Sequence, residues 1–338
     1  MTIREIAQMA NVSIGTVDRV LNNRAGVSSA TKAKIESIVE QTGFHANAYA
    51  RNLKLGKKAV IGVMIPLGSS EYGYWNLVLD GIRKAGAEFS GFGLALKYGF
   101  YDRDKAGDFT QAFRTLQNEG CTAYLIAPLP VSEFPSAELR ESGLPVAFID
   151  STIPSFTPVA VIAQNPFKGG FVAGRVTRLL SSGTGTFVTI QIHPDAYNSF
   201  ERARGFRTYI MRDGRNNVVD VNVRSVDDIP HVLDDVFSSH EDIRGIFTVN
   251  CIINAAGEYL VHRRIKDKVV AVGYDLVEEN RNALKNGSVD AVISQRPAFQ
   301  GYTAVSALFR KVVQGEAVSP AEIPIDIYFE ENLIEGSE

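Results

Sequence analysis

Residues 2–23 read TIREIAQMANVSIGTVDRVLNN, and this stretch decides the fold at the start of the chain. Its apolar residues first follow the i, i+3, i+4, i+7 spacing of one helix face: Ile3, Ile6, Ala7 and Ala10. Asn11 and Val12 then predict a turn, because Asn tolerates left-handed backbone. Ser13 is a typical N-cap for a second helix, whose apolar face consists of Val17, Val20 and Leu21.

A third helix is predicted after Ser28 or Ser29, which completes the order of a helix-turn-helix unit. Opposite its apolar face, the short second helix carries Ile14, Gly15, Asp18 and Arg19. Such a face suits insertion into the major groove of DNA, where an arginine can read guanine. On the residues alone, a small helical bundle that docks another protein is an equally open interpretation.

The charge of the chain is divided unevenly along its length. The 338 residues carry 35 Lys and Arg against 38 Asp and Glu, a formal net charge of −3. Residues 1–58 hold nine of the bases and four of the acids, so this segment is +5 and the remainder is −8. A small basic segment on an acidic body indicates a polyanionic partner for that segment.

Composition limits the class of protein. With 45% hydrophobic residues the chain is expected to be globular, and its length predicts two or three domains. We find no apolar run of about 18 residues and no secretory signal, so we expect no membrane span and a cytoplasmic location. Cys121 and Cys251 lie far apart, which fits a reducing compartment rather than a disulfide framework.

From Ala59 onward, short apolar runs alternate with amphipathic helical segments. The runs predict strands at 59–66, 93–99, 123–128, 145–150, 159–163, 186–192, 218–223, 245–250, 268–275 and 290–294. This alternation predicts an α/β fold with two doubly wound parallel-sheet subdomains. We expect the boundary between them near 160–165 and a return of the chain near Gln295.

Polar and aromatic residues follow these strands at corresponding places, where ligands of parallel sheets bind. They are Tyr72, Tyr74, Trp75, Asp150, Gln164, Arg202, Asn250, Asp275 and Gln295. Planar polar side chains suit the fixed geometry of sugar hydroxyls, and aromatic rings stack on sugar faces. We therefore expect a site for a small effector, with a carbohydrate favoured and a purine or another metabolite as the alternative.

Catalytic and metal-binding motifs do not accompany this set. HExxH, GxSxG and phosphate-loop patterns are absent from the sequence, and the five His residues lack the spacing of metal ligands. We expect no catalytic residue, no metal and no cofactor.

Residues 2–23, with VSSATKAKIESIVEQTGFHANAYARNL at 27–53, resemble the DNA-binding head of LacI/GalR-family transcriptional regulators. The resemblance implies base-reading positions for Ile14, Gly15 and Arg19. It implies phosphate contacts for Thr2, Ser13, Thr16, Asn22, Ser28 and Thr31. Residues 47–54 resemble the family's hinge helix, in which Asn47 and Ala50 share a face with Leu53. Leu53 matches a leucine that wedges into the minor groove, although it could instead be a packing residue.

Residues 59–330 resemble the periplasmic-binding-protein-like effector domain of the same family, through IGVMIP at 61–66, FERARGF at 200–206 and VAVGYD at 270–275. By position, the matches to effector contacts are Asp150, Arg202, Asn250, Asp275 and Gln295, and Trp75 matches a ring-stacking aromatic. The chain departs from the family pattern at Asp18, at Ala46 and at Gln164-Asn165-Pro166.

The resemblance implies four parts: a helix-turn-helix domain at 1–45, a hinge helix and linker at 46–58, and two effector subdomains. The subdomains are expected at 59–162 plus about 295–321 and at 163–294 plus about 322–333. Together these features predict a homodimeric (or larger) repressor that binds double-stranded operator DNA under the control of a small effector. The helix predicted at 73–88 is a dimer surface under this hypothesis. An exported solute-binding protein is the main alternative, and a sugar-converting enzyme is a third.

Overall fold

The computed structural model describes residues 3–21, 25–42, 58–67 and 73–334. The chain divides into two compact units, 1–57 and 58–338, which we call the head and the body. The described part of the head consists of α1 (Ile3–Ala10), α2 (Ile14–Leu21) and α3 (Ser29–Thr42). Ile6, Val17 and Ile35 are fully buried where these helices meet. Asn11 links α1 to α2 with φ 55°, the left-handed geometry that the sequence predicts there.

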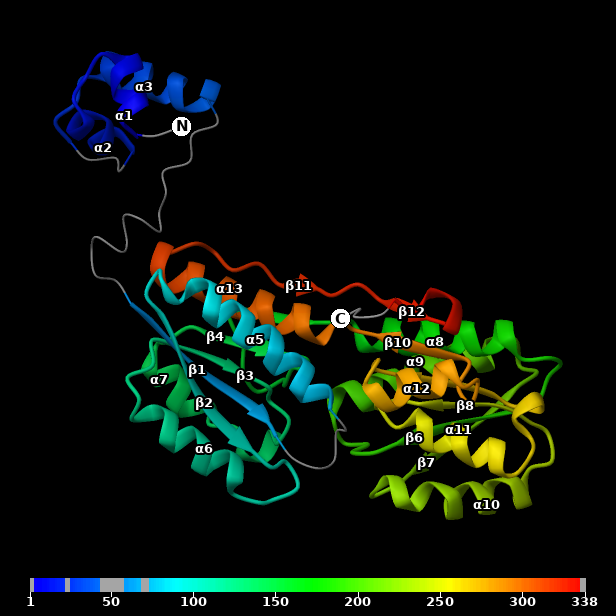
Figure 1. Ribbon diagram of the computed structural model, residues 1–338. Coiled ribbons are helices and arrows are strands. Elements are labelled where there is room, and N and C mark those ends of the chain that lie inside the picture. The colour runs from blue at the N-terminus through cyan, green and yellow to red at the C-terminus, as the bar shows by residue number, and fades with distance from the viewer. Residues whose placement is uncertain (1–2, 22–24, 43–57, 68–72, 335–338) are drawn as a thin grey trace. The chain divides into compact units, whose positions relative to one another are not determined.

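The body contains two six-stranded sheets with corresponding strand orders, each forming one lobe (Figure 1). The first lobe has the order β11-β5-β4-β3-β1-β2 and the second has β12-β10-β9-β8-β6-β7, so β1–β5 correspond to β6–β10. The first-lobe strands are β1 (Ala59–Pro66), β2 (Leu94–Tyr101), β3 (Ala123–Ile126), β4 (Val146–Ile149), β5 (Ala160–Ala163) and β11 (Ala321–Glu322). The second-lobe strands are β6 (Thr186–Gln191), β7 (Asn217–Asn222), β8 (Ile243–Thr248), β9 (Val270–Tyr274), β10 (Ala291–Ser294) and β12 (Asp326–Tyr328).

Helices cover both faces of each sheet. In the first lobe, α5 (Tyr74–Ser90) and α13 (Pro297–Gln314) pack together on one face, and α6 (Asp108–Gln117) and α7 (Ser136–Ser142) cover the other. In the second lobe one face carries α8 (Pro166–Leu180) and α9 (Tyr197–Ile210), and the other carries α10 (Ile229–Ser239), α11 (Ile253–His262) and α12 (Glu278–Lys285). Burial on both faces explains why the strands read as continuous apolar runs.

The chain passes between the lobes three times, at 163–166, 294–297 and 322–326, which we call the crossover segments. Figure 1 shows the last of them, between β11 and β12, in red along one edge of the body. β11 pairs parallel to β5, whereas β12 pairs antiparallel to β10. This antiparallel edge strand was not predicted, because strands of two or three residues are too short to show a periodic pattern.

The α/β fold class with two doubly wound subdomains is confirmed, and β1–β10 match the predicted runs to within two residues at either end. Helix α7 escaped prediction because its seven residues bury a single side chain, that of Leu139. No helix in the described part of the chain is long and apolar enough to cross a membrane.

Candidate functional site

The face of α2 turned away from the head's core is exposed and carries three of the predicted DNA-contacting residues. Ile14 is 44% exposed, and Gly15 and Arg19 are also exposed, whereas Val17 and Val20 on the opposite face are buried. The core therefore fixes the helix while leaving this face free for a partner.

Two matching serine–threonine pairs cap α2 and α3. Ser13 Oγ accepts a 3.1 Å hydrogen bond from the backbone N–H of Thr16, and the two hydroxyl oxygens are 2.9 Å apart. Ser28 Oγ accepts one of 3.2 Å from the N–H of Thr31, and these hydroxyl oxygens are 2.8 Å apart. Helix N-termini attract anions, so both pairs stand where a phosphate could bind. The remaining predicted DNA contacts lie outside the described residues: Thr2, Asn22, Asn47, Ala50 and Leu53.

In the body, a polar cavity lies where the carboxyl ends of the two sheets meet. Its lining consists of Tyr74, Asp150, Asn198, Arg202, Asn250, Cys251, Asp275 and Gln295. Six of these eight are residues predicted from the sequence, brought together from both lobes. The free volume within it is about 20 Å³, room for one water molecule, because the lining side chains bond to one another.

Two aspartates occupy corresponding positions in the two lobes. Asp150 follows β4 and Asp275 follows β9, with left-handed φ of 66° and 63°. His193, just after β6, has φ 55°. Non-glycine residues rarely adopt this backbone and are over-represented at functional sites.

The Asp150 carboxylate accepts hydrogen bonds from both lobes. Tyr74 Oη donates to Oδ1 and Asn198 Nδ2 donates to Oδ2, each at 2.8 Å. Burial raises the pKa of Asp150, and Arg202 and these hydrogen bonds oppose that rise. Burial, together with Asp150, also raises the pKa of Tyr74, which therefore remains a hydrogen-bond donor.

Arg202 is 4% exposed and provides the cation of the cavity. Its Nη1 donates to the carbonyl of Val249 at 2.9 Å, and its guanidinium lies 3.9 Å from the centre of the Tyr274 ring. Its buried Nε has no hydrogen-bond partner among the described residues. An unsatisfied buried donor is costly, so a ligand acceptor here would relieve that cost.

Amide side chains orient the remaining polar groups. Gln295 Nε2 donates to Asp275 Oδ1 at 2.9 Å, and Gln300 Nε2 donates to the backbone carbonyl of Gln295 at 2.8 Å. Asn250 Oδ1 accepts from the N–H of Ile192 at 3.0 Å, which fixes its amide plane. The Gln295 and Asn250 amides, which line the cavity, can exchange a protein partner for a ligand hydroxyl.

Of the predicted effector residues that the structure describes, Trp75 and Gln164 stand apart from this lining. Trp75 is 5% exposed and packs edge-on against Tyr74 at 5.1 Å between ring centres, so it supports the cavity wall. Gln164 turns toward the crossover segments, and Tyr72 lies outside the described residues. Asn198 and Cys251 were missed, although Asn198 lies one helical turn before Arg202 and Cys251 directly follows Asn250.

A histidine of the second lobe also lies close to a carboxylate of the first. His193 Nδ1 of the second lobe lies 3.7 Å from Asp104 Oδ1 of the first. Burial and, to a lesser extent, the neighbouring Arg103 lower the pKa of His193 to about 4, while Asp104 opposes the shift. In the part of the chain that the structure describes, no three His, Cys, Asp or Glu side chains are grouped as metal ligands.

Two family models match the chain. The periplasmic binding protein domain model covers residues 61–317, and the model of bacterial regulatory proteins of the lacI family covers residues 2–47. This chain belongs to the periplasmic binding protein domain family, and its head is a lacI-family regulatory domain. The regulator joins this head to a periplasmic-binding-protein body, as its sequence predicts.

Relatives and solved structures match most of this regulator's length. It is 24% identical to the ribose operon repressor of Halalkalibacterium halodurans over 81% of this chain and 80% of the relative. It is 24% identical to the transcriptional repressor PurR of Vibrio atlanticus over 82% of each chain. A crystal structure assigned as a LacI transcriptional regulator from Bacteroides fragilis matches with a TM-score of 0.74 and 28% identity, covering 82% of this chain and 98% of that one. The glucose-galactose binding protein GanP of Geobacillus stearothermophilus has a TM-score of 0.74 at 19% identity, over 82% of this chain and 99% of GanP, which shows a common fold.

Proposed function

We propose that this regulator is a DNA-binding repressor whose operator affinity is set by a small effector bound in the cavity of the body. One observation carries the proposal: a basic head with an exposed α2 face precedes a body with a buried polar cavity between two lobes. The head supplies charge of the sign that phosphates require, and the α2 face supplies side chains for reading bases.

The experiment is a comparison of two duplexes. Binding of the full chain to the DNA upstream of its own gene is measured against a scrambled duplex of equal length, across a range of salt concentrations. We expect preference for the upstream DNA at every salt concentration and a steep loss of affinity for both duplexes as salt rises. Equal affinity for the two sequences contradicts the proposal.

The cavity residues favour an uncharged sugar as the effector. Two carboxylates, Asp150 and Asp275, face one guanidinium, that of Arg202, so an anionic ligand would add to an excess of negative charge. Sugar hydroxyls can donate to the carboxylates and accept from Arg202 Nε. A thermal-shift series of D-ribose, D-glucose, D-galactose and hypoxanthine tests this preference, because a bound ligand raises the melting temperature. A shift with hypoxanthine alone contradicts it.

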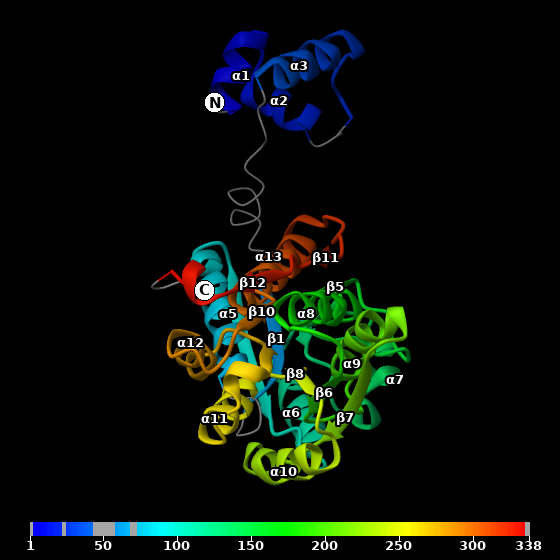
Figure 2. The same cartoon turned by 90° about the vertical axis from the view of Figure 1, so that its right-hand side faces the viewer.

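We propose a homodimer, since two heads on a two-fold site read more sequence than one. The edge strand β2 exposes Tyr98 and Phe100, which are 37% and 39% exposed and stack with ring centres 5.5 Å apart. Helix α5 packs on β2 beside this pair. Partial burial raises the pKa of Tyr98, and Arg83 of α5 opposes this rise. Figure 2 shows α5, α11 and α12 on the same side of the body. An exposed apolar edge bordered by helices suits a second copy of the chain, and a sedimenting mass of one chain at micromolar concentration contradicts this proposal.

The relatives of the regulator are repressors and sugar-binding proteins, so we propose a cytoplasmic protein without catalytic activity. The alternative of an exported solute-binding protein accounts for the body only. The head, which matches the lacI family model at residues 2–47, favours the regulator.

A further inference from the structure

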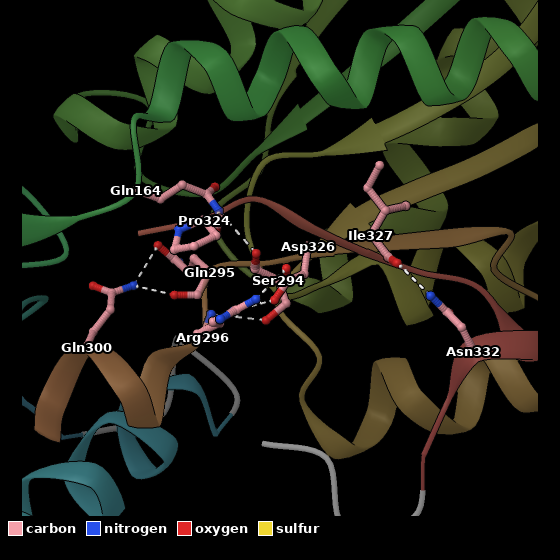
Figure 3. A network of polar contacts seen from close by, with 9 residues as sticks. All are labelled: Gln164, Ser294, Gln295, Arg296, Gln300, Pro324, Asp326, Ile327 and Asn332. Atoms are coloured by element: carbon pink, nitrogen blue, oxygen red, sulfur yellow. Dashed lines mark hydrogen bonds and ion pairs between the residues drawn. The ribbon is translucent and has the colours of Figure 1, made fainter. Parts of the chain in front are cut away.

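The side chain of Gln164 contacts the other two crossover segments. Gln164 lies on the first crossover segment, and its Nε2 donates to the carbonyls of Ser294 and Pro324, each at 3.0 Å. Figure 3 shows Gln164 next to both residues, which belong to the second and third crossover segments. The side chain is 3% exposed, so water does not compete for these bonds. One buried amide therefore connects all three crossover segments, which are the connections between the two lobes.

The oxygen of the same amide bonds to the tyrosine over which the cavity arginine lies. Gln164 Oε1 accepts a 2.6 Å hydrogen bond from Tyr274 Oη, and the Tyr274 ring lies 3.9 Å from the guanidinium of Arg202. Burial raises the pKa of Tyr274, so its hydroxyl remains protonated and donates. A continuous series of contacts thus runs from Arg202 through Tyr274 and Gln164 to every crossover segment.

Gly169, in the first turns of α8, makes room for this series. A Cβ atom at Gly169 would overlap the Tyr274 hydroxyl and lie 2.9 Å from Gln164 Oε1. A residue without a side chain is therefore required for the Tyr274 hydroxyl to reach Gln164. Replacement by alanine would separate these two groups without removing either.

We propose that Gln164 is a positioning residue that transmits occupancy of the cavity to the crossover segments. The proposal rests on the effector function proposed above and deepens it. A ligand acceptor that engages Arg202 Nε moves the guanidinium over Tyr274, and the Tyr274 hydroxyl moves with its ring. Because a buried amide is costly to leave without partners, Gln164 follows that hydroxyl and shifts the carbonyls of Ser294 and Pro324.

Hydrogen exchange of the full chain, followed on peptides that span the three crossover segments, tests the proposal without DNA or effector. Arg202→Met removes the guanidinium and should raise exchange in all three peptides by roughly tenfold, a coupling typical of residues in contact. Tyr274→Phe keeps the ring and removes the hydroxyl. In the Tyr274→Phe background we expect Arg202→Met to change exchange by less than about twofold. The same comparison is made with Gly169→Ala, and again with Gln164→Met, in place of Tyr274→Phe. One poorly folded variant therefore does not decide the outcome.

Tyr101→Phe is the matched control. It removes another buried tyrosine hydroxyl, which donates to the carbonyl of Ala127 at 2.7 Å inside the first lobe. Arg202→Met should retain its full effect in this background, since Tyr101 is not part of the series. Equal effects of Arg202→Met in the Tyr101→Phe and Tyr274→Phe backgrounds overturn the proposal. The proposed function is tested separately, since this exchange experiment does not measure it. Failure of the unchanged protein to bind operator DNA or a sugar would count against that function.

Discussion

Asn198 of the second lobe donates a 2.8 Å hydrogen bond to Asp150 of the first, inside the cavity. Both side chains are buried, so this bond links the two lobes away from bulk water. We predict that Asn198→Ala lowers the free energy of unfolding by about 1–3 kcal/mol, because it leaves a buried carboxylate oxygen without its donor. Chemical denaturation measures this change. The control Asn118→Ala, on the exposed end of α6, should stay within about 0.5 kcal/mol of the unchanged protein.

Asp275→Asn should weaken binding of the effector. The change preserves the shape of a side chain that lines the cavity but removes its charge, and hydrogen bonds to charged groups contribute about 1.5–3 kcal/mol. We expect a loss of at least roughly tenfold in affinity for whichever sugar gives the largest thermal shift, with operator affinity unchanged in its absence. Titration calorimetry and DNA binding measure the two quantities. Asp235→Asn on α10 is the exposed control, and an unchanged sugar affinity in Asp275→Asn would show that Asp275 is not a ligand contact.

Arg19→Ala should reduce specificity more than overall attraction to DNA. If Arg19 reads a guanine, its loss costs about 1–3 kcal/mol on the operator and much less on a scrambled duplex. Fluorescence anisotropy with both duplexes gives the ratio of affinities. Lys32→Ala provides the comparison, since an exposed lysine near the Ser28 cap should weaken both duplexes alike. A uniform loss in Arg19→Ala would assign that residue to phosphate instead.

The stability of the body should depend on pH through His193. Burial lowers its pKa from 6.5 to about 4, so the folded protein binds this proton less readily than the unfolded chain. Its contribution to stability is therefore present above pH 6.5 and is lost as the pH falls toward 4. Asn tolerates the left-handed backbone at this position. We predict that His193→Asn makes the loss of stability over this pH interval smaller by up to about 3 kcal/mol. Denaturant unfolding across the interval measures the slope, and an identical slope with His193→Asn, but not with the exposed His231→Asn, would exclude this role.

Much of the fold could be predicted from the sequence because burial on both faces makes a parallel strand visible as an apolar run. Ile61, Val63 and Ile65 in β1 are all fully buried, and the predicted bounds of this strand match the structure. β12 was missed because its three residues are only half-buried. It pairs with β10 after the chain has returned from the first lobe along the third crossover segment. Its position depends on tertiary contacts that no local pattern records.

For the cavity, the rule that ligands lie at strand ends selected the right region but not every orientation. Asp150 and Asp275 were predictable because each directly follows a buried strand. Gln164 follows β5 in the same way, yet its amide turns to Ser294 and Pro324, residues 130 and 160 positions away along the chain. Which way a side chain points at a strand end depends on partners that the sequence does not place nearby.

The three crossover segments also constrain the order in which the body can fold during its synthesis. α13 covers β1, β3, β4 and β5, but it lies more than 130 residues after the last of them. While the second lobe is being translated, one face of the first-lobe sheet is therefore covered by α5 without α13, and the edge of the second-lobe sheet lacks β12 until the end of the chain. We infer that neither lobe completes its fold on the ribosome before the other. A nascent chain stopped within α13 would expose part of the first-lobe sheet face and the edge of the second-lobe sheet.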